Sequence, residues 1–404
     1  MPPAVRCDFT ETTVQPAAPA LAHHAGPAGA TSRRLRIGFV MEQVLGHVTW
    51  YQNLRQAVTA LNEVEARWVE TRLFDPQGRL ERLPILPSYV KASARAWLDV
   101  HRGLRAWPHD VLVFNTHKAA ALCQWQMLHT PTMLMTDVTP LQYDRMAELY
   151  DHRVDGNPLL RAAKHQANVL NFRLARALVT CSTWTRDSFI HDYGIPPERV
   201  HVIPVGLDTG YWRPAEPRRG SSRVQLLFVG GHFERKGGRL LLDVFHGLGL
   251  QERADLHVVT RDPLEPSPGV IVHHNIQNNS PELLRLYQQA DVFVLPTLAD
   301  CFSNAALEAM ATGLPVVITA MGGIPDIVEH GRTGYLLPAG NGQELAAVLR
   351  RLVDDAPLRR ALGAAGRQRA VARFDSRTNA ARLLTLAREL YAQRPPRGVA
   401  SRPV

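Results

Sequence analysis

Cysteine is scarce in this sequence, with 4 residues in 404. No two cysteines form a Cys-x-x-Cys pair, which argues against a disulfide scaffold or a zinc site and is typical of a reducing cytosol. No stretch approaches ~18 uninterrupted apolar residues, the length that crosses a bilayer. The first residues also lack the basic start and apolar run of a secretory signal. We therefore expect a cytoplasmic protein without a transmembrane helix.

Lysine is equally scarce, with 4 residues beside 42 arginines. The net charge is +9, and a basic balance can indicate nucleic acid or an anionic membrane as a partner. However, residues 350–404 hold 13 arginines and 4 acidic residues, whereas residues 1–349 are neutral overall. We expect these C-terminal arginines to face solvent or an anionic membrane surface, and we expect no nucleic-acid partner.

The rest of the composition is that of a soluble globular protein, with 45% apolar and 21% charged residues. Residues 1–32 are rich in Ala, Pro, Gly and Thr without periodicity, and residues 394–404 contain three prolines. We expect a disordered leader and a disordered tail there.

Short apolar runs alternate with amphipathic stretches between these ends. The expected strands are 35–41, 110–115, 132–136, 177–180, 224–229, 255–260, 270–272, 292–295 and 315–319. The expected helices are 51–61, 88–107, 118–129, 159–176, 239–248, 281–290 and 303–312, and helices continue from 343 with breaks near 356 and 375. This alternation predicts parallel sheets with helices on both faces.

The pattern breaks into Gly, Pro and Arg around residues 205–219 and then restarts. We therefore expect an α/β protein with two doubly wound, Rossmann-like domains that face each other across a cleft. The domains would span residues 33–208 and 209–374, and a helix over 375–393 would cross back to the N-terminal domain. Ligands of such folds bind at the carboxyl ends of strands, and inter-domain clefts are favoured sites.

The densest chemical pattern is PTLADCFSNAALEAMATGLPVV, residues 296–317. Asp300 follows a strand end, Ser303 or Asn304 can cap the next helix, and Glu308 comes eight positions after Asp300. A helix N-terminus offers unpaired N–H groups and a partial positive charge, which suit an anionic or polyhydroxyl ligand. A capped strand–loop–helix connection with a solvated Glu308 explains the pattern equally well. Two carboxylates are also found in glycoside hydrolases.

A second pattern is LFVGGHFERKGG, residues 227–238. Gly230 and Gly231 would let backbone N–H groups approach a phosphate, and Arg235 and Lys236 would neutralise it. The spacing matches neither a Walker loop nor a GxGxxG fingerprint. A turn with exposed charges is the structural alternative.

Together, these two segments resemble the retaining GT-B-type glycosyltransferases, the nucleotide-sugar-dependent "group 1" or family 4-like group. The resemblance rests on Asp300, Phe302, Glu308 and AMATGLPVV, and on VHVIPVGLD (200–208), RKGG, GGIPDIV (322–328) and GRTGYLL (331–337). It implies a GT-B architecture and a role in carbohydrate biosynthesis. It also implies transfer of a hexose from a UDP- or GDP-type sugar to a hydroxyl of a glycan, lipid or small molecule.

The resemblance implies a role for each matching residue. Glu308 matches an acid on the donor's ribose, Asp300 an acid on the donor sugar, and Lys236 a lysine on the diphosphate. Gly206 matches the glycine of a Gly-x-Asp turn at the inter-domain linker. The backbone amides facing sugar and phosphate would be those of Cys301, Phe302, Ser303 and Asn304.

Two departures from the family pattern stand out. Gly231 occupies a position where many members have Arg, and we expect Arg235 to supply that charge. Asp300 replaces the more frequent Glu, and Cys301 replaces the usual Gly, so sugar selection would be altered.

In the N-terminal half, several strand-end residues are candidates for the acceptor side. Gly46 fits a glycine loop facing the cleft or an ordinary turn. Asp137 lies where many family members place a His near the acceptor, and it is our acceptor-side catalytic candidate. His117 ends a strand and either faces the cleft or is structural, and Tyr143 and Asp144 would line the acceptor pocket.

The resemblance implies retention of anomeric configuration, with the nucleotide diphosphate as leaving group. Arg235, Lys236 and the helix N-terminus would stabilise its charge, and the leaving phosphate itself would take the acceptor's proton. The chain has no Asp-x-Asp pair. We therefore expect a metal-independent enzyme without a bound cofactor.

Other functions remain open at this point. A nucleotide-sugar epimerase or a phosphorylase could use the same scaffold. A nucleic-acid or membrane-binding protein could act through the basic C-terminal part. A non-catalytic relative is the third alternative, supported by Gly231. The oligomeric state is likewise open.

The segment 88–107 bears on membranes. Lys91, Arg95, Arg102 and Arg105 lie among apolar residues on it, and a basic amphipathic helix can lie on an anionic bilayer. This would place the protein peripherally at the inner face of the plasma membrane. Alternatively, the apolar side of the helix packs on the sheet.

Overall fold

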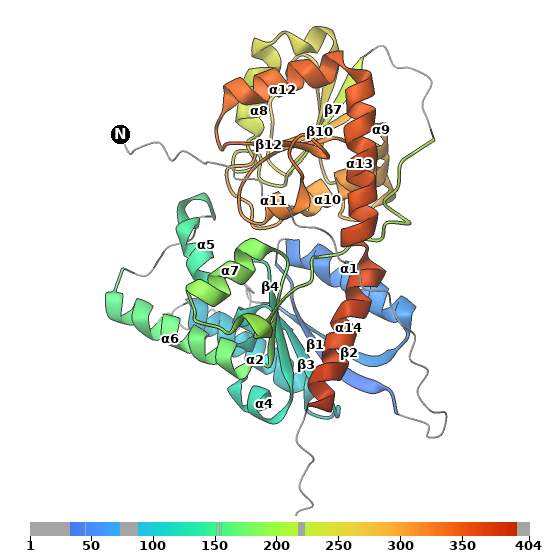
Figure 1. The fold of residues 1–404 in the computed structure, drawn as a ribbon. Helices are drawn as coiled ribbons and strands as arrows, with labels where there is room; N and C mark the ends of the chain where they lie inside the picture. Colours follow the sequence, from blue (N-terminus) through green and yellow to red (C-terminus); the bar gives the residue numbers. More distant parts are fainter. Residues whose placement is uncertain are drawn as a thin grey trace, which may run out of the picture. The chain divides into compact units, whose positions relative to one another are not determined.

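The computed structural model describes residues 33–44, 46–72, 88–150, 152, 154, 156–216 and 223–393. The expected disordered leader and tail, 1–32 and 394–404, lie outside these residues. The described residues from Arg34 to Gln393 cluster as one compact unit. This unit contains two six-stranded sheets, each entirely parallel (Figure 1). The predicted α/β architecture with two doubly wound sheets is thus confirmed.

The first sheet has the strand order β2-β1-β3-β4-β5-β6. Its strands are β1 (Leu35–Glu42), β2 (Val64–Thr71), β3 (Val111–Asn115), β4 (Thr132–Thr136), β5 (Ala177–Thr180) and β6 (Val200–Val202). Its helices are α1 (Gly46–Leu61), α2 (Ser88–Leu104), α3 (His117–Ala120), α4 (Gln124–His129), α5 (Pro140–Arg145), α6 (Pro158–Leu174) and α7 (Thr183–His191).

The second sheet has the strand order β12-β11-β10-β7-β8-β9. Its strands are β7 (Val224–Val229), β8 (Ala254–Val259), β9 (Val270–His273), β10 (Val292–Leu295), β11 (Val316–Thr319) and β12 (Gly334–Leu337). The following helices are α8 (Gly238–Gly247), α9 (Pro281–Gln289), α10 (Asn304–Ala311), α11 (Ile324–Ile327), α12 (Gly342–Asp354), α13 (Ala356–Phe374) and α14 (Ser376–Ala392).

Local sequence explains where many helices begin. Asn157, Ser280, Asn341 and Asp355 each cap a helix by accepting a backbone N–H with the side chain. Such caps satisfy amide groups that have no partner within the helix. Proline at the first helical position of α6 and α9, and at the second of α13, adds a backbone already set for a helix.

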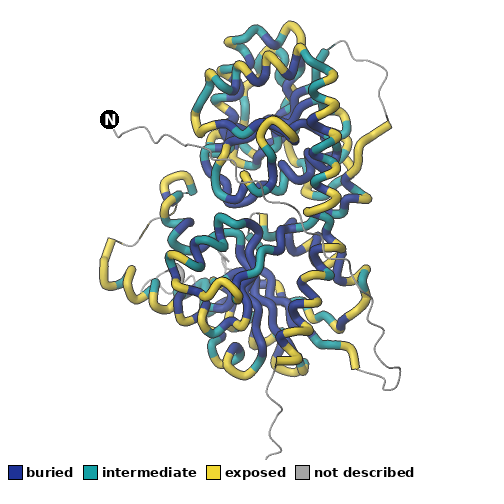
Figure 2. The backbone as a smooth tube through the Cα atoms, viewed as in Figure 1, coloured by how far each residue is buried: buried dark blue, intermediate teal, exposed yellow. Residues whose placement is uncertain are grey.

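Alternating residues of the first sheet pack on opposite faces. Phe39 and Val113 belong to a core shared with α1 and α14, whereas Val40 and Phe114 belong to a core shared with helices α2 to α7. Strand residues that face either core are buried (Figure 2). This is why the central strands read as continuous apolar runs.

Three strands and one helix break were missed by the apolar pattern. β2 is an edge strand with alternating exposure, and its sequence VEARWVET is mostly polar. β6 and β12 have only 3 and 4 residues.

The segment predicted as one helix over 118–129 forms α3 and α4 instead. Its chain turns around Leu122 with no Gly or Pro to mark the break, and this turn buries both Cys123 and Met127.

The chain passes between the two sheets at one crossing point. Leu207 and Asp375 form an isolated bridge, with Leu207 N donating to Phe374 O at 2.9 Å and Ser376 N donating to Leu207 O at 2.9 Å. A Cβ on Gly206 would lie 2.4 Å from the Ser376 Cα. Only glycine therefore allows the two backbones to approach so closely.

After this crossing, α14 packs against α1 and β3 of the first sheet. Several arginines of the basic C-terminal part point inward, contrary to the expectation that they face solvent or membrane. Arg367 donates to the carbonyl groups of Thr209, Trp212 and Ala311 at 2.7–2.9 Å. Arg369 donates to the carbonyl groups of Asp326 and Ile327 and pairs with Glu329. Much of the local positive charge therefore holds loops together.

We predict that Gly206→Ala lowers stability by about 1–3 kcal/mol, because its Cβ would overlap backbone that cannot move freely. Gly247→Ala is the matched control, since no atom lies within 4 Å of its Cβ position. Thermal midpoints measured side by side test this. Equal midpoints for the two variants would contradict the close approach at the crossing.

Candidate active site

One cavity of about 680 Å³ is lined by residues that follow the carboxyl ends of strands in both sheets. In the first sheet, strands are added in one direction from β1 and in the opposite direction from β3, so the switch point lies between these two strands. In the second sheet, the switch point lies between β7 and β10. Ligands of doubly wound sheets bind outside these switch points. The cavity lining includes His47 and His117, which follow β1 and β3, and Lys236 and Asp300, which follow β7 and β10.

Lys236 and Asp300 form the central ion pair of this cavity. Lys236 Nζ lies 2.5 Å from Asp300 Oδ2, and both side chains are largely buried. The glycine after Lys236 makes this possible. Gly237 has φ +78°, and a Cβ there would lie 1.9 Å from the Pro296 carbonyl oxygen. The β7–α8 loop thus lies directly against the β10–α10 loop.

Helix α10 points its N-terminus at the same cavity. Ser303 accepts from the Ala306 amide and caps the helix. The first-turn amides of Asn304 and Ala305 have no partner within the helix and, as both residues line the cavity, they are available to a ligand. The helix dipole adds a partial positive charge.

Glu308 lies inside α10 and is buried, with an exposed fraction of 7%. The Tyr287 hydroxyl donates to Glu308 Oε2 at 2.9 Å. Burial raises the pKa of Glu308 to about 7, although the Tyr287 hydrogen bond opposes this. The predicted alternative of a solvated glutamate is therefore wrong, because this carboxyl is desolvated at the edge of the cavity.

Arg235 contacts the same loop before α10 as Lys236 does. Its Nη1 donates to the Ala299 carbonyl at 2.9 Å, and its guanidinium lies 4.4 Å from the Tyr150 ring centroid. The Tyr150 hydroxyl is 3.7 Å from Cys301 Sγ. Burial is the main cause that raises the pKa of Cys301, so it is a neutral thiol in the wall of the cavity.

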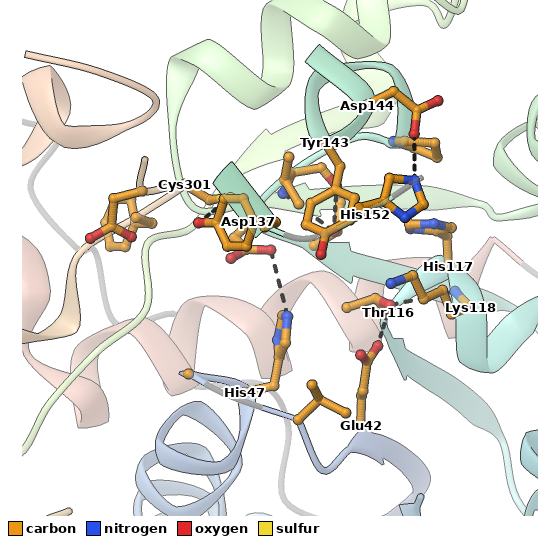
Figure 3. A pocket seen from close by; sticks show the side chains of 18 of the residues that line it. Glu42, His47, Thr116, His117, Lys118, Asp137, Tyr143, Asp144, His152 and Cys301 are labelled. Atoms are coloured by element: carbon orange, nitrogen blue, oxygen red, sulfur yellow. Dashed lines mark hydrogen bonds and ion pairs between the residues drawn. The ribbon is translucent and has the colours of Figure 1, made fainter. Parts of the chain in front are cut away.

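The first sheet contributes a second group of polar residues (Figure 3). His47 Nε2 lies 3.7 Å from Asp137 Oδ1, and burial raises the pKa of Asp137. Glu42 accepts from the Thr116 hydroxyl at 2.6 Å. Opposite them, Asn304 Nδ2 donates to the Gly46 carbonyl at 3.4 Å, which joins α10 to the start of α1.

His117 also lines the cavity. Burial lowers its pKa to about 3, so its imidazole is neutral near pH 7. Its Nδ1 is buried and has no hydrogen-bond partner in the described part of the chain. A neutral imidazole has one donor and one acceptor nitrogen, so the part of the His117 ring that lines the cavity can contact a ligand hydroxyl.

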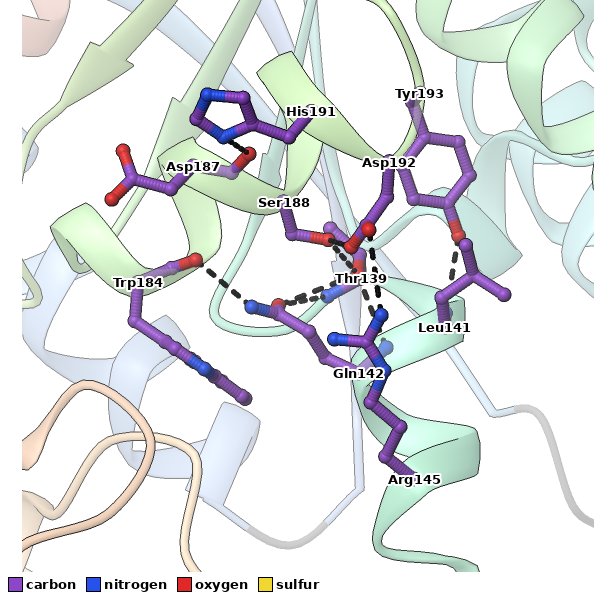
Figure 4. A network of polar contacts seen from close by, with 10 residues as sticks. All are labelled: Thr139, Leu141, Gln142, Arg145, Trp184, Asp187, Ser188, His191, Asp192 and Tyr193. Carbon is purple, nitrogen blue, oxygen red and sulfur yellow. Dashed lines mark hydrogen bonds and ion pairs between the residues drawn. The ribbon is translucent and has the colours of Figure 1, made fainter. Parts of the chain in front are cut away.

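A polar network fixes the helix that carries Tyr143 and Asp144 (Figure 4). Thr139 and Gln142 form a capping box at the start of α5. Thr139 Oγ1 lies 2.8 Å from Ser188 Oγ, and Gln142 Nε2 donates to the Trp184 carbonyl at 2.9 Å. These contacts tie α5 to α7.

From this helix, Tyr143 and Asp144 reach the cavity wall. Asp144 pairs with His152 at 2.9 Å, and Lys118 Nζ lies 5.1 Å from the Tyr143 ring centroid. Both residues thus lie on the side of the cavity that belongs to the first sheet.

The structure brings all the sequence-predicted site residues to this one cavity. Its lining contains the predicted residues Gly46, Asp137, Gly230, Gly231, Arg235, Lys236, Asp300, Cys301, Phe302, Ser303, Asn304 and Glu308. Gly206, which was expected at the linker between the domains, lies at the crossing point. Sequence reasoning missed Glu42, His47, Tyr150 and Arg261. The position of Glu42 and Arg261 at or after strand ends was a signal that could have found two of them.

The amphipathic segment predicted at 88–107 forms α2, which packs against β2. Lys91 and Arg95 are buried, and Trp97 is exposed. Two of the four cations expected to face a bilayer therefore lie inside the protein.

Comparisons with known proteins agree with this geometry. "Glycosyltransferase Family 4" matches residues 51–211, and "Glycosyl transferases group 1" matches residues 223–355. A curated relative, "MMP alpha-(1->4)-mannosyltransferase" of Mycolicibacterium hassiacum, is 31% identical over 298 residues, which are 70% of this chain and 71% of that protein. The chain belongs to the group 1, family 4 glycosyltransferases.

Solved structures show that this glycosyltransferase has the GT-B fold. Sucrose-phosphate synthase from Thermosynechococcus elongatus superposes with a TM-score of 0.69 at 18% identity, covering 89% of this chain and 100% of that one. An Anabaena protein, HepE, in complex with UDP-glucose gives a TM-score of 0.62 at 16% identity, covering 88% and 100%. Further curated glycosyltransferases match over only 51% and 53% of their own length.

The described residues contain no group of three or more His, Cys, Asp or Glu side chains placed to hold a metal ion. None of their helices combines the length and the apolar character needed to cross a membrane.

We predict that Glu308→Gln stabilises the ligand-free protein increasingly as pH rises from 5 to 8. The folded-state pKa of Glu308, about 7, lies above the value of 4.5 for an unperturbed glutamate. The wild type is therefore fully stabilised below about pH 4.5 and loses stability as pH rises through 7, by up to about 3 kcal/mol. Glutamine keeps an acceptor for Tyr287 without titrating.

Thermal midpoints of wild type and Glu308→Gln, measured at each pH, test this. If the thermal midpoints of the two proteins change with pH in parallel, ionisation of Glu308 does not destabilise the folded state, and the prediction is wrong.

Proposed function

We propose that this glycosyltransferase transfers a hexose, with retention of anomeric configuration, from a nucleotide-diphosphate sugar to a hydroxyl acceptor. The observation that carries this proposal is the meeting of three groups in one cavity. These are the Lys236–Asp300 pair, the first-turn amides of α10 beside its Ser303 cap, and the buried Glu308. Each suits a different part of a nucleotide sugar.

The donor would lie along the second sheet. Glu308 would accept hydrogen bonds from the ribose hydroxyls, which compensate its desolvation. Asp300 would accept from the hydroxyls of the sugar, and Lys236 and the α10 amides would bind the diphosphate. The donor is of UDP or GDP type. Support for a hexose comes from the mannosyltransferase relative and from the UDP-glucose complex of HepE.

The chemical step places negative charge on the leaving diphosphate. Lys236 lines the same cavity as the first residues of α10, so it can stabilise this charge as it develops. The α10 amides are fixed in the helix before the reaction, which keeps their reorganisation small. The proposed reaction is metal-independent, because cationic side chains and helix amides perform the stabilisation. The leaving phosphate accepts the proton of the attacking hydroxyl.

The acceptor would enter from the first sheet. His47 and Asp137 face the cavity there, and the neutral His117 can contact an acceptor hydroxyl. Burial raises the pKa of Asp137, and its carboxyl would hold or orient the acceptor through a hydrogen bond. The acceptor is a hydroxyl of a glycan, a lipid or a small molecule.

A thermal-shift screen of UDP, GDP and their sugars tests donor binding. A ligand present at 100 times its Kd should stabilise the protein by roughly 2.7 kcal/mol. Glu308→Ala should abolish that shift for nucleotides. If Glu308→Ala binds and turns over the donor like the wild type, Glu308 is not part of the donor site.

Product analysis by NMR then separates the reaction classes. With the donor found in the screen and a panel of hydroxyl acceptors, we expect a product with the anomeric configuration of the donor. An inverted product contradicts the retaining mechanism. Conversion of the donor without an acceptor indicates an epimerase, and dependence on free phosphate indicates a phosphorylase.

A further inference from the structure

The cations closest to the donor side of the cavity are already engaged. Lys236 is paired with Asp300 at 2.5 Å. Arg235 donates to the Ala299 carbonyl and covers Tyr150, so part of its guanidinium already serves the neighbouring loop. A diphosphate brings about two or more negative charges, and charge-assisted hydrogen bonds are its strongest contacts. The two engaged cations do not match that charge.

A third cation lies over the same loop. Arg261 follows β8, and it is exposed and lines the cavity. A Cβ on Gly231 would lie 3.5 Å from Arg261 Nε and 3.6 Å from its Cζ, and all three of its nearest atoms belong to Arg261. The Arg261 guanidinium thus lies next to the space that a side chain at position 231 would fill.

The backbone holds Arg261 in this place. Gly230 N donates to the Val259 carbonyl at 2.9 Å, and Phe233 N donates to Asp262 Oδ2 at 2.7 Å. These two bonds flank Arg261 and join its loop to the β7–α8 loop. The stem of Lys236 lies over the adjacent glycine, since a Cβ on Gly230 would be 2.9 Å from Lys236 Cβ.

The Arg261 guanidinium has no hydrogen bond or ion pair with any residue in the described ranges. A planar guanidinium with free donors is suited to binding phosphate oxygens in a bidentate manner. We propose that Arg261 binds the diphosphate of the donor and takes the place of a side chain at position 231. This assignment rests on the proposed function, because it assumes a nucleotide-diphosphate donor.

The first test is the affinity for the nucleoside diphosphate that the screen identifies, UDP or GDP, measured by calorimetry. We expect Arg261→Gln to raise the Kd about 10- to 100-fold, as the loss of a charge-assisted hydrogen bond does. Arg261→Lys should recover part of the affinity, since lysine keeps the charge but not the fork. An unchanged Kd for Arg261→Gln overturns the proposal.

The matched control is Arg253→Gln. Arg253 precedes β8, at the opposite end of the strand from Arg261, and pairs on the surface with Asp354. The Kd of the Arg253→Gln variant for the nucleoside diphosphate should equal that of the wild type. The unliganded thermal midpoint of Arg261→Gln should also be unchanged, because the side chain holds no partner. A lowered midpoint would indicate a structural role and overturn the assignment.

A compensating variant gives the sharpest test. Gly231 lies outside the positive-φ region, so a side chain is tolerated there once Arg261 is removed. Gly231→Arg combined with Arg261→Gln should return the Kd to within about 3-fold of the wild type, whereas Gly231→Leu with Arg261→Gln should not.

Failure of the arginine to restore affinity, or equal restoration by leucine, overturns the proposal. A wild type that binds neither UDP nor GDP overturns the proposed function itself. A wild type that binds, with Arg261→Gln binding equally, overturns the role of Arg261 alone.

Discussion

The structure depends on one close approach of backbone to backbone, at Gly206 and Ser376. The chain leaves the first sheet through this point and returns to it along α14, and the Leu207–Asp375 bridge holds both passages together. Arg367 reinforces the crossing by binding three carbonyl groups beside it. Because both passages are fixed here, the carboxyl ends of the two parallel sheets meet at one cavity.

Within that cavity, the two sheets contribute side chains that differ in charge and burial. The second sheet carries an ion pair, a helix N-terminus and a desolvated glutamate. These groups are preorganised for a ligand with an anionic centre and hydroxyl groups at its ends. The first sheet carries neutral or weakly acidic groups, His117 and Asp137, whose charged forms burial disfavours. Such groups suit an uncharged hydroxyl.

The arginines of this chain illustrate how little a charge total says about function. Arg367 and Arg369 belong to the basic C-terminal part, yet they bind carbonyl groups in the interior. Arg235 stands in a phosphate-type loop but supports a neighbouring loop. Arg261 has no such partner among the described residues. Whether a guanidinium serves the fold or a ligand depends on which carbonyl groups lie within its reach.

The sequence by itself determined the parallel α/β architecture and the residues around Lys236, Asp300 and Glu308. These follow from periodicity and from motifs in which a strand end, a loop and a helix start are consecutive. It could not place Arg261 over Gly231 or His47 beside Asp137, because these pairs come from elements that meet only through strand pairing across the sheet. It also could not show that Glu308 is desolvated or that the C-terminal arginines point inward. Burial depends on which elements pack together, and only the tertiary structure decides that.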